Sequence, residues 1–299
     1  MARRPAASGG AWLRRGALAG ATGLLVAWLA GPPLWLLVSS VSPEGELLAR
    51  PPHWIPGRPT VENLASLVSG SPRERRIAEL TGVKYFRQGL LTSGVICAGV
   101  IVLSIGAAAP MAYSLARLVS RRVRTWVLAS LLAFRMLPLT TVIIPIYVVA
   151  QAVGALNTLT ALVVVYAGLL LPFAVWLLVT YFQTVPEEVE EAARIDGCSW
   201  SQVLLRITLP LARPGLFATV AFLFISTWTD LFIGLVLTTE PAKQPLSVVV
   251  SLFASGLATD TPWGLVNAAG LIATAVPLAL GLVFRRYILT GGLLGGAFR

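Results

Sequence analysis

The amino-acid sequence predicts an all-α, polytopic membrane protein with about six transmembrane helices. Hydrophobic residues make up 56% of its 299 residues and charged residues only 12%, whereas a soluble domain carries about 25% charged residues. Long runs without any charge extend from residue 16 to 43, from 88 to 116 and from 136 to 186. Because a helix needs about 20 apolar residues to cross a bilayer, these runs predict membrane spans.

One transmembrane domain over residues 1–299 accounts for this pattern. The first apolar run follows Arg14 and Arg15 as in a signal peptide, but it is too long for one and lacks a small-residue cleavage site, so we expect an uncleaved helix. Gly154 and Asn157 divide the longest uncharged run, since both residue types favour turns. The spans are expected at about 17–40, 88–116, 125–150, 157–182, 215–238 and 263–284.

The arginines predict the orientation, because cytoplasmic loops carry an excess of positive charge. A dense group lies between the second and third spans, at positions 117, 121, 122 and 124. With this group inside, both termini and the loop 183–213 are expected in the cytoplasm. In a soluble protein the net charge of +10 favours nucleic-acid binding. Here the arginines cluster at the ends of the spans, where they determine the orientation of the chain in the membrane, so no nucleic-acid partner is expected.

The segment 42–87 is then expected outside the membrane. Its first part is rich in proline and predicts an extended chain, whereas residues 71–82 mix charges of both signs and predict a short helix. Two interpretations stay open for this segment, a solvated loop and a contact surface for an external partner.

The sequence holds no recognisable catalytic or nucleotide-binding motif. A P-loop needs a lysine followed by Ser or Thr to hold phosphates, whereas Lys84 precedes Tyr and Lys243 precedes Gln. His53 is the one histidine, and Cys97 and Cys198 fall in an apolar span and in a polar loop. These residues cannot meet to form a metal site, so we expect a non-catalytic chain that binds no cofactor of its own.

The loop 183–213 predicts two short helices. Thr184 and Glu187 have the spacing of a capping box and predict the start of the first helix. Gly197 predicts its end, because a residue without Cβ readily adopts the left-handed cap. Ser199 and Gln202 repeat the capping-box spacing and predict the start of the second helix.

Both predicted loop helices are amphipathic. Val189, Ala192 and Ala193 recur at helical spacing and predict one apolar stripe on the first helix. Pro210 and Pro214 are expected to end the second helix and redirect the chain into the fifth span. The residues alone leave two readings open. The loop is either a solvated amphipathic segment stabilised by its own caps or a docking surface whose acidic side chains pair with a partner's arginines.

Residues 191–210, EAARIDGCSWSQVLLRITLP, have the form E-A-A-x3-G-x9-I-x-L-P. This stretch resembles the EAA loop of binding-protein-dependent ABC importer permeases, and the acidic lead-in before it resembles the same family. In that family the loop helix sits in a cleft of the ATPase. The resemblance therefore implies a cytoplasmic coupling helix–turn–helix that contains Glu187, Glu188, Glu191, Ala192, Ala193, Asp196, Gly197, Ile207, Leu209 and Pro210.

Other stretches resemble the carbohydrate branch of the family, and within it the smaller, maltose-permease-like subunit. Residues 228–230, WTD, resemble the family's W-N-(E/D), with Thr229 in place of the usual Asn. The tail 285–299, RRYILTGGLLGGAFR, resembles the family's glycine-rich ending, although it needs one extra residue. The external stretch 70–85 is longer than is usual in the family.

The resemblance implies an importer in a bacterial plasma membrane. Its expected partners are a second, different permease subunit, two ATPase subunits that bind ATP and Mg²⁺, an external solute-binding protein and a sugar. A disaccharide such as maltose or trehalose is the expected substrate. The alternatives are a permease for a glycerophosphodiester or a polyamine, and a non-transporting membrane scaffold or sensor.

Two charged residues fall within predicted spans, Arg135 in the third and Asp230 in the fifth. Each costs about 2.5–3.5 kcal/mol at the centre of a span, so such residues usually face a bundle interior or a wet cavity. At about 1.5 Å per residue they lie about 15 Å and 24 Å from the inner ends of their spans, so a direct ion pair needs tilt or snorkelling. We interpret Arg135, Trp228 and Asp230 as residues of the sugar path, with packing against the partner subunit as the alternative.

Overall fold

The computed structural model describes residues 9–51, 53–69, 81–253 and 261–290. Within these ranges all regular elements are helical, which confirms the all-α prediction. In chain order the elements are α1 (Gly9–Ser40), α2 (Glu44–Leu47), α3 (Glu62–Ser69), α5 (Thr81–Arg117), α6 (Arg121–Arg135), α7 (Leu139–Ala152), α8 (Leu159–Phe182), α9 (Glu187–Ile195), α10 (Trp200–Val203), the π-helix η1 (Leu204–Thr208), α11 (Leu209–Leu211), α12 (Arg213–Thr229), α13 (Phe232–Leu237), the 3₁₀-helix η2 (Pro241–Lys243), α14 (Leu246–Phe253) and α15 (Trp263–Thr290).

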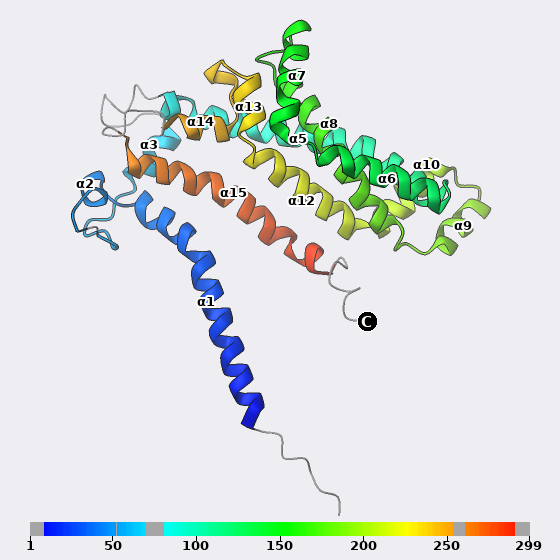
Figure 1. Ribbon diagram of the computed structural model, residues 1–299, viewed down its shortest axis with the longest axis horizontal. Coiled ribbons are helices and arrows are strands. Elements are labelled where there is room, and N and C mark those ends of the chain that lie inside the picture. Colours follow the sequence, from blue (N-terminus) through cyan, green and yellow to red (C-terminus); the bar gives the residue numbers. More distant parts are fainter. Residues whose placement is uncertain (1–8, 52, 70–80, 254–260, 291–299) are drawn as a thin grey trace, which may run out of the picture.

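The continuous long helices α1, α5, α8 and α15 correspond to the first, second, fourth and sixth predicted spans. In the described part of the chain these 4 helices are long and apolar enough to cross a membrane, and the number rises to 6 if each sharply bent helix pair is one span. The helix α1 projects away from the other helices (Figure 1), and its most apolar stretch is not buried within the chain.

The third predicted span, 125–150, is not one straight helix. The helices α6 and α7 meet at an angle of 85°, and Pro138 takes the position before the first turn of α7, with an extended backbone. Proline donates no backbone N–H and disfavours the helical conformation of the residue before it. Arg135 is therefore the last residue of α6 and lies directly beside the break.

The fifth predicted span, 215–238, is also interrupted. The helix α12 ends at Thr229, because the backbone of Asp230 is extended with φ −70° and ψ 132°, and α13 follows after this break. At its other end α12 meets the segment Trp200–Leu211 at 83°. The sequence analysis also missed α14, whose eight residues are too few to stand out as a span. Its first N–H, that of Leu246, donates to Ser93 Oγ of α5 at 2.8 Å.

The segment predicted outside the membrane contains regular structure. The carboxylate of Glu44 accepts hydrogen bonds from the backbone N–H groups of Trp263 and Gly264 and so caps the start of α15. Asn63 of α3 donates to the carbonyls of Ser40 and Ser42, at the end of α1. The short helix predicted over 71–82 lies almost wholly outside the described residues, and only its last two positions belong to α5.

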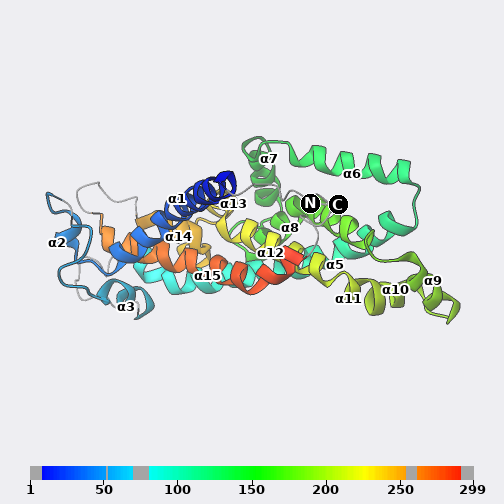
Figure 2. The same cartoon turned by 90° about the horizontal axis from the view of Figure 1, so that it is seen from below.

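The helices α2 and α3 lie at one end of the molecule, and α9 and α10 lie at the opposite end (Figures 1 and 2). Between these ends the packing centres on α5 and α8, whose buried faces form the larger of two hydrophobic clusters. At Gly99 a Cβ atom would lie 2.9 Å from Val163 Cγ2, so glycine permits the close approach of α5 and α8. The two loops that the sequence places on opposite sides of a membrane are thus far apart.

Candidate functional site

The loop between α8 and α12 forms the helix–turn–helix that the sequence predicts. The helix α9 ends in a turn in which Gly197 has φ +89°, the left-handed conformation expected of it. The Ser199 N–H donates to Gln202 Oε1 at 2.7 Å, and the Gln202 N–H donates to Ser199 Oγ at 3.4 Å. This capping box confirms the predicted start of the second helix.

The capping box predicted at Thr184 is wrong. The Thr184 hydroxyl donates to the carbonyl of Tyr181 at 2.7 Å, and α9 begins later, with Pro186 at its cap position and no side-chain cap. A helix that starts at Thr184 would need Val185 in helical conformation, which the following proline disfavours.

The predicted apolar stripe on α9 is not buried as a whole within the chain. The buried residues of α9 are Glu190 and Ala193, whereas Val189 is 44% exposed and Ala192 is exposed. The outward face of the loop combines these apolar residues with most of the residues predicted for coupling. The exposed members of that set are Glu187, Glu188, Glu191, Ala192, Asp196 and Gly197, whereas Ala193 is buried and Ile207, Leu209 and Pro210 are partly buried.

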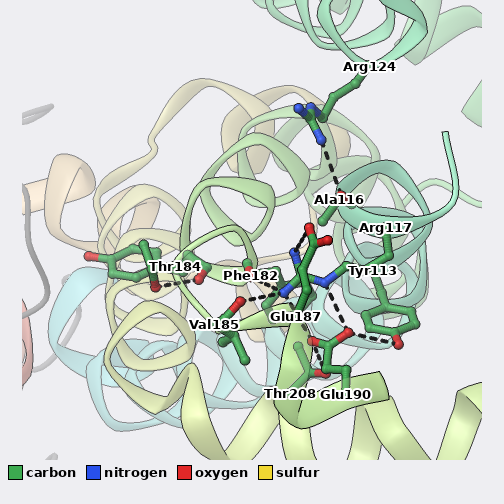
Figure 3. A network of polar contacts seen from close by, with 11 residues as sticks. Tyr113, Ala116, Arg117, Arg124, Phe182, Thr184, Val185, Glu187, Glu190 and Thr208 are labelled. Atoms are coloured by element: carbon green, nitrogen blue, oxygen red, sulfur yellow. Dashed lines mark hydrogen bonds and ion pairs between the residues drawn. The ribbon is translucent and has the colours of Figure 1, made fainter. Parts of the chain in front are cut away.

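The inward face of α9 is anchored by an ion pair between Glu190 and Arg117, the last residue of α5 (Figure 3). Arg117 Nε lies 3.0 Å from Glu190 Oε2, and Arg117 Nη2 lies 3.1 Å from Glu190 Oε1. The side chains are only 7% and 5% exposed. Two parallel N–H···O bonds of this kind fix geometry as well as charge.

Further hydrogen bonds extend this junction to other segments. Thr208 Oγ1 of η1 donates to Glu190 Oε1 at 2.9 Å, and the Tyr113 hydroxyl donates to Glu190 Oε2 at 3.2 Å. Arg117 Nη2 also donates to the carbonyls of Phe182, at the end of α8, and Val185. We call Tyr113, Arg117, Glu190 and Thr208 the junction cluster. It joins α5, the end of α8, α9 and η1.

Sequence reasoning counted Glu190 among the acidic residues of the loop but gave it no separate role. The available signal was its spacing, because Glu190 and Ala193 lie at i and i+3 and so share a helix face. An unpaired buried carboxylate is costly. The partner, Arg117, had been interpreted only as a determinant of orientation.

The two charges predicted for the sugar path line one cavity of about 520 Å³, which Tyr166 and Ser226 also line. Asp230 Oδ2 accepts the Tyr166 hydroxyl at 2.8 Å and the Ile233 N–H at 2.9 Å. The carboxylate therefore holds the start of α13 to α8. Sequence reasoning missed Tyr166 and Ser226, because no pattern relates them to Asp230 before the chain is folded.

Arg135 is exposed in the single chain, lines this cavity and has no carboxylate partner among the described residues. Its guanidinium lies over the rings of Phe173 and Phe222, at 5.7 and 5.4 Å from their centroids. Arg135 Nη1 donates to the carbonyl of Leu169 at a long 3.4 Å. Among the ion pairs of the described residues none includes Arg135 or Asp230, so the cavity brings these charges together without a salt bridge.

Trp228 does not line this cavity. It is 6% exposed, its Nε1–H donates to the carbonyl of Ala273 in α15 at 2.9 Å, and its ring stacks on Phe224 at 5.2 Å between centroids. Trp228 thus faces α15, whereas Asp230, after the end of α12, faces Tyr166 of α8. The interpretation of Trp228 as a residue of this site is not supported, and its contacts are those of core packing.

Comparison with known proteins gives concordant results. Residues 80–290 match the family model described as "Binding-protein-dependent transport system inner membrane component". The chain is 31% identical over 268 residues to the sulfoquinovosyl glycerol transport system permease protein SmoH of Agrobacterium fabrum, covering 90% of this chain and 88% of that protein. It is 28% identical to the trehalose/maltose transport system permease protein MalG of Thermococcus litoralis, over 90% and 91% of the two chains.

The fold is also similar to that of a solved structure. A chain from a bacterial ABC transporter involved in the import of the acidic polysaccharide alginate superposes with a TM-score of 0.76. The match covers 95% of this chain and 100% of that one, at 20% sequence identity. The two chains therefore share their overall fold.

Proposed function

Because this chain belongs to the family of binding-protein-dependent transport system inner membrane components, we propose that it is a permease subunit of an ABC importer that carries a sugar into the cell. The observation that carries this proposal is the family match over residues 80–290. The printed names of the relatives support a sugar, since they include sulfoquinovosyl glycerol, trehalose/maltose and diacetylchitobiose systems. We propose a solute of disaccharide size.

The chain itself does not hydrolyse ATP in this proposal. Two separate ATPase subunits bind ATP and Mg²⁺, a second permease subunit completes the pore, and an external binding protein delivers the sugar. The chain crosses a bacterial plasma membrane with both termini and the loop 183–213 in the cytoplasm. The distance between the α2–α3 end and the α9–α10 end (Figure 1) supports the assignment of these two ends to opposite membrane faces.

The loop 183–213 is the proposed docking surface for an ATPase. Its exposed face carries Glu187, Glu188 and Glu191. Glu187 also lies 3.4 Å from Arg117, but its side chain is 69% exposed, whereas the side chain of Glu190 is 5% exposed and binds Arg117 through two bonds. A loop that serves only as a solvated connection has no need of a buried, bidentate ion pair to the end of a long helix. This difference in burial favours a rigidly held docking surface over a solvated loop.

The assembled complex tests this function. We expect purification through a tag on this chain to yield an ATPase whose ATP turnover rises when the sugar-loaded binding protein is added in nanodiscs. We expect Glu191→Lys to abolish the stimulation and Glu62→Lys, an exposed first-turn glutamate of α3, to preserve it. A scaffold or sensor predicts no solute-dependent ATP hydrolysis. A permease for a polyamine or a glycerophosphodiester predicts stimulation by those solutes and none by any sugar.

A further inference from the structure

Two helix breaks and two intramembrane charges meet at one cavity. Arg135 ends α6 beside the break before α7, and Asp230 forms the break between α12 and α13. Both line the cavity of about 520 Å³. Irregular backbone at membrane depth persists only where protein buries it or where it lines a cavity, and charges there are costly. Discontinuous helices of this kind form the substrate sites of many transporters.

Arg135 and Asp230 differ in how well they are satisfied. Asp230 Oδ2 accepts two hydrogen bonds, from the Tyr166 hydroxyl and the Ile233 N–H. A guanidinium carries five N–H donors, and Arg135 makes one long hydrogen bond and two ring contacts within the described chain. The group that lacks partners is therefore the cation, and the ligand that satisfies a guanidinium best is a bidentate oxyanion.

We propose that this cavity binds one saccharide unit of the transported solute, and that Arg135 is the counter-ion of an acidic substituent, a carboxylate or a sulfonate, on that sugar. This inference rests on the proposed function and specifies its substrate class. A volume of about 520 Å³ lies within the range of about 300–1,000 Å³ typical of small-molecule sites.

The other polar groups that line the cavity, Asp230 and Ser226, can form hydrogen bonds with the hydroxyls of the same sugar. An ionised carboxylate has about four lone-pair sites, so Asp230 retains acceptors for sugar hydroxyls beyond the two bonds that it makes. Ser226 lines the same cavity and adds a hydroxyl that both donates and accepts. In this proposal Arg135 binds the acidic group of the sugar, and Asp230 and Ser226 bind its neutral hydroxyls.

Ligand-induced thermal stabilisation tests the proposal without the selectivity of the binding protein. The transporter, purified through this chain and placed in nanodiscs without binding protein, is titrated with sodium glucuronate, glucose and sodium acetate at equal ionic strength. We expect glucuronate to raise the unfolding midpoint more than either control does. In Arg135→Gln we expect the half-saturating glucuronate concentration to rise about tenfold to a hundredfold, since a hydrogen bond to a charged group contributes about that factor.

Arg122→Gln is the matched control, because Arg122 is an exposed arginine in the first turn of the same helix. It should respond as the wild type does. If Arg135→Gln does not assemble, Arg135→Lys keeps the charge without the bidentate geometry and should weaken the glucuronate response. Equal responses to glucuronate and glucose, or an undiminished glucuronate response in the Arg135 variant that assembles, would overturn the proposal. Sugar-stimulated ATP turnover after addition of the loaded binding protein to the same preparations would then show that only the subsite, and not the transport function, has failed.

Discussion

The carboxylate of Glu190 in α9 is held by the guanidinium of Arg117, the last residue of α5, through bonds of 3.0 and 3.1 Å. The pair is almost completely buried. It ties the proposed docking helix to a helix of 37 residues that extends through the molecule. The pair therefore connects the exposed loop directly to α5.

Loss of the charge on Glu190 should weaken this connection. Glu190→Gln removes the bidentate, buried partner of Arg117 and leaves only the exposed carboxylate of Glu187, 3.4 Å away, as its counter-charge. Breaking a buried pair costs about 3–5 kcal/mol. We expect a lower unfolding midpoint and a fall of about tenfold or more in sugar uptake per ATP hydrolysed, within the range of typical coupling energies. The measurements are thermal unfolding and coupled uptake in proteoliposomes. Glu188→Gln changes an exposed neighbour and should alter stability little, so equal losses in the two variants would contradict the assignment.

The turn at Gly197 should be needed for coupling. A Cβ there meets nothing within 4 Å, so the penalty of Gly197→Leu is conformational, because its φ is +89°. Left-handed backbone costs a residue with Cβ about 1–2 kcal/mol, and relief of that strain would reorient α9 relative to α10. We expect membrane insertion to persist while ATP hydrolysis no longer drives uptake.

Gly154 supplies the control for this experiment. It also has positive φ, +67°, with open space around its Cβ position, but it lies between α7 and α8, away from the loop. Gly154→Leu should carry a similar strain and leave uptake coupled to ATP hydrolysis. Normal coupling in Gly197→Leu, or equal uncoupling in both variants, would count against a special role of the loop.

Trp228 and Asp230 should have separable roles. Trp228→Ala removes a buried ring and its bond to Ala273, so we expect a loss of about 3–5 kcal/mol in stability without a change in sugar preference. Asp230→Asn removes the charge from the cavity and should lower uptake in a complex that still assembles. Competition uptake with different sugars measures preference. A changed preference in Trp228→Ala, or normal uptake in Asp230→Asn, would reverse these assignments.

Close packing beneath the loop should also limit substitution. In Gly215→Ala the new Cβ atom in α12 would overlap Cβ and the ring of Tyr181, so the backbones of α8 and α12 must move apart. Such overpacking costs typically about 1–3 kcal/mol. Gly94→Ala in α5 meets open space and should leave stability unchanged or slightly higher. The unfolding midpoints of the two variants compare these effects, and similar midpoints would show that α8 and α12 are not packed this closely.

Hydropathy alone was enough to predict that the continuous helices exist, because each contains a long apolar run. It missed their polar ends, since α5 begins at Thr81 rather than near 88 and α1 begins at Gly9 rather than near 17. The break at Pro138 was missed, since proline within a span produces either a mild kink or a full break. The break at Asp230 was missed because no proline marks it. Both breaks lie beside the cavity that Arg135 and Asp230 line, which forms only once the helices are packed.

Local chemistry predicted Gly197 and the Ser199–Gln202 box, because both depend on neighbouring residues. Four glutamates in five positions look alike in sequence, and only the three-dimensional placement of Arg117 selects Glu190 for burial. The same reason explains Trp228, whose direction is set by α15, a helix remote in sequence. The burial of Glu190 and the direction of Trp228 thus depend on contacts between helices that are distant in sequence.

Site-specific cross-linking from α9 tests the central claim most directly. In a variant with Cys97 and Cys198 replaced by Ala, Ala192→Cys places one thiol on the exposed face of α9, and Glu62→Cys places one on α3. We expect a thiol-specific cross-linker in native membranes to join Ala192→Cys, but not Glu62→Cys, to a protein with an ATP-binding P-loop, identified by mass spectrometry. Capture of only an extracytoplasmic protein from Ala192→Cys, or of no ATPase in membranes that still import the sugar, would contradict the account.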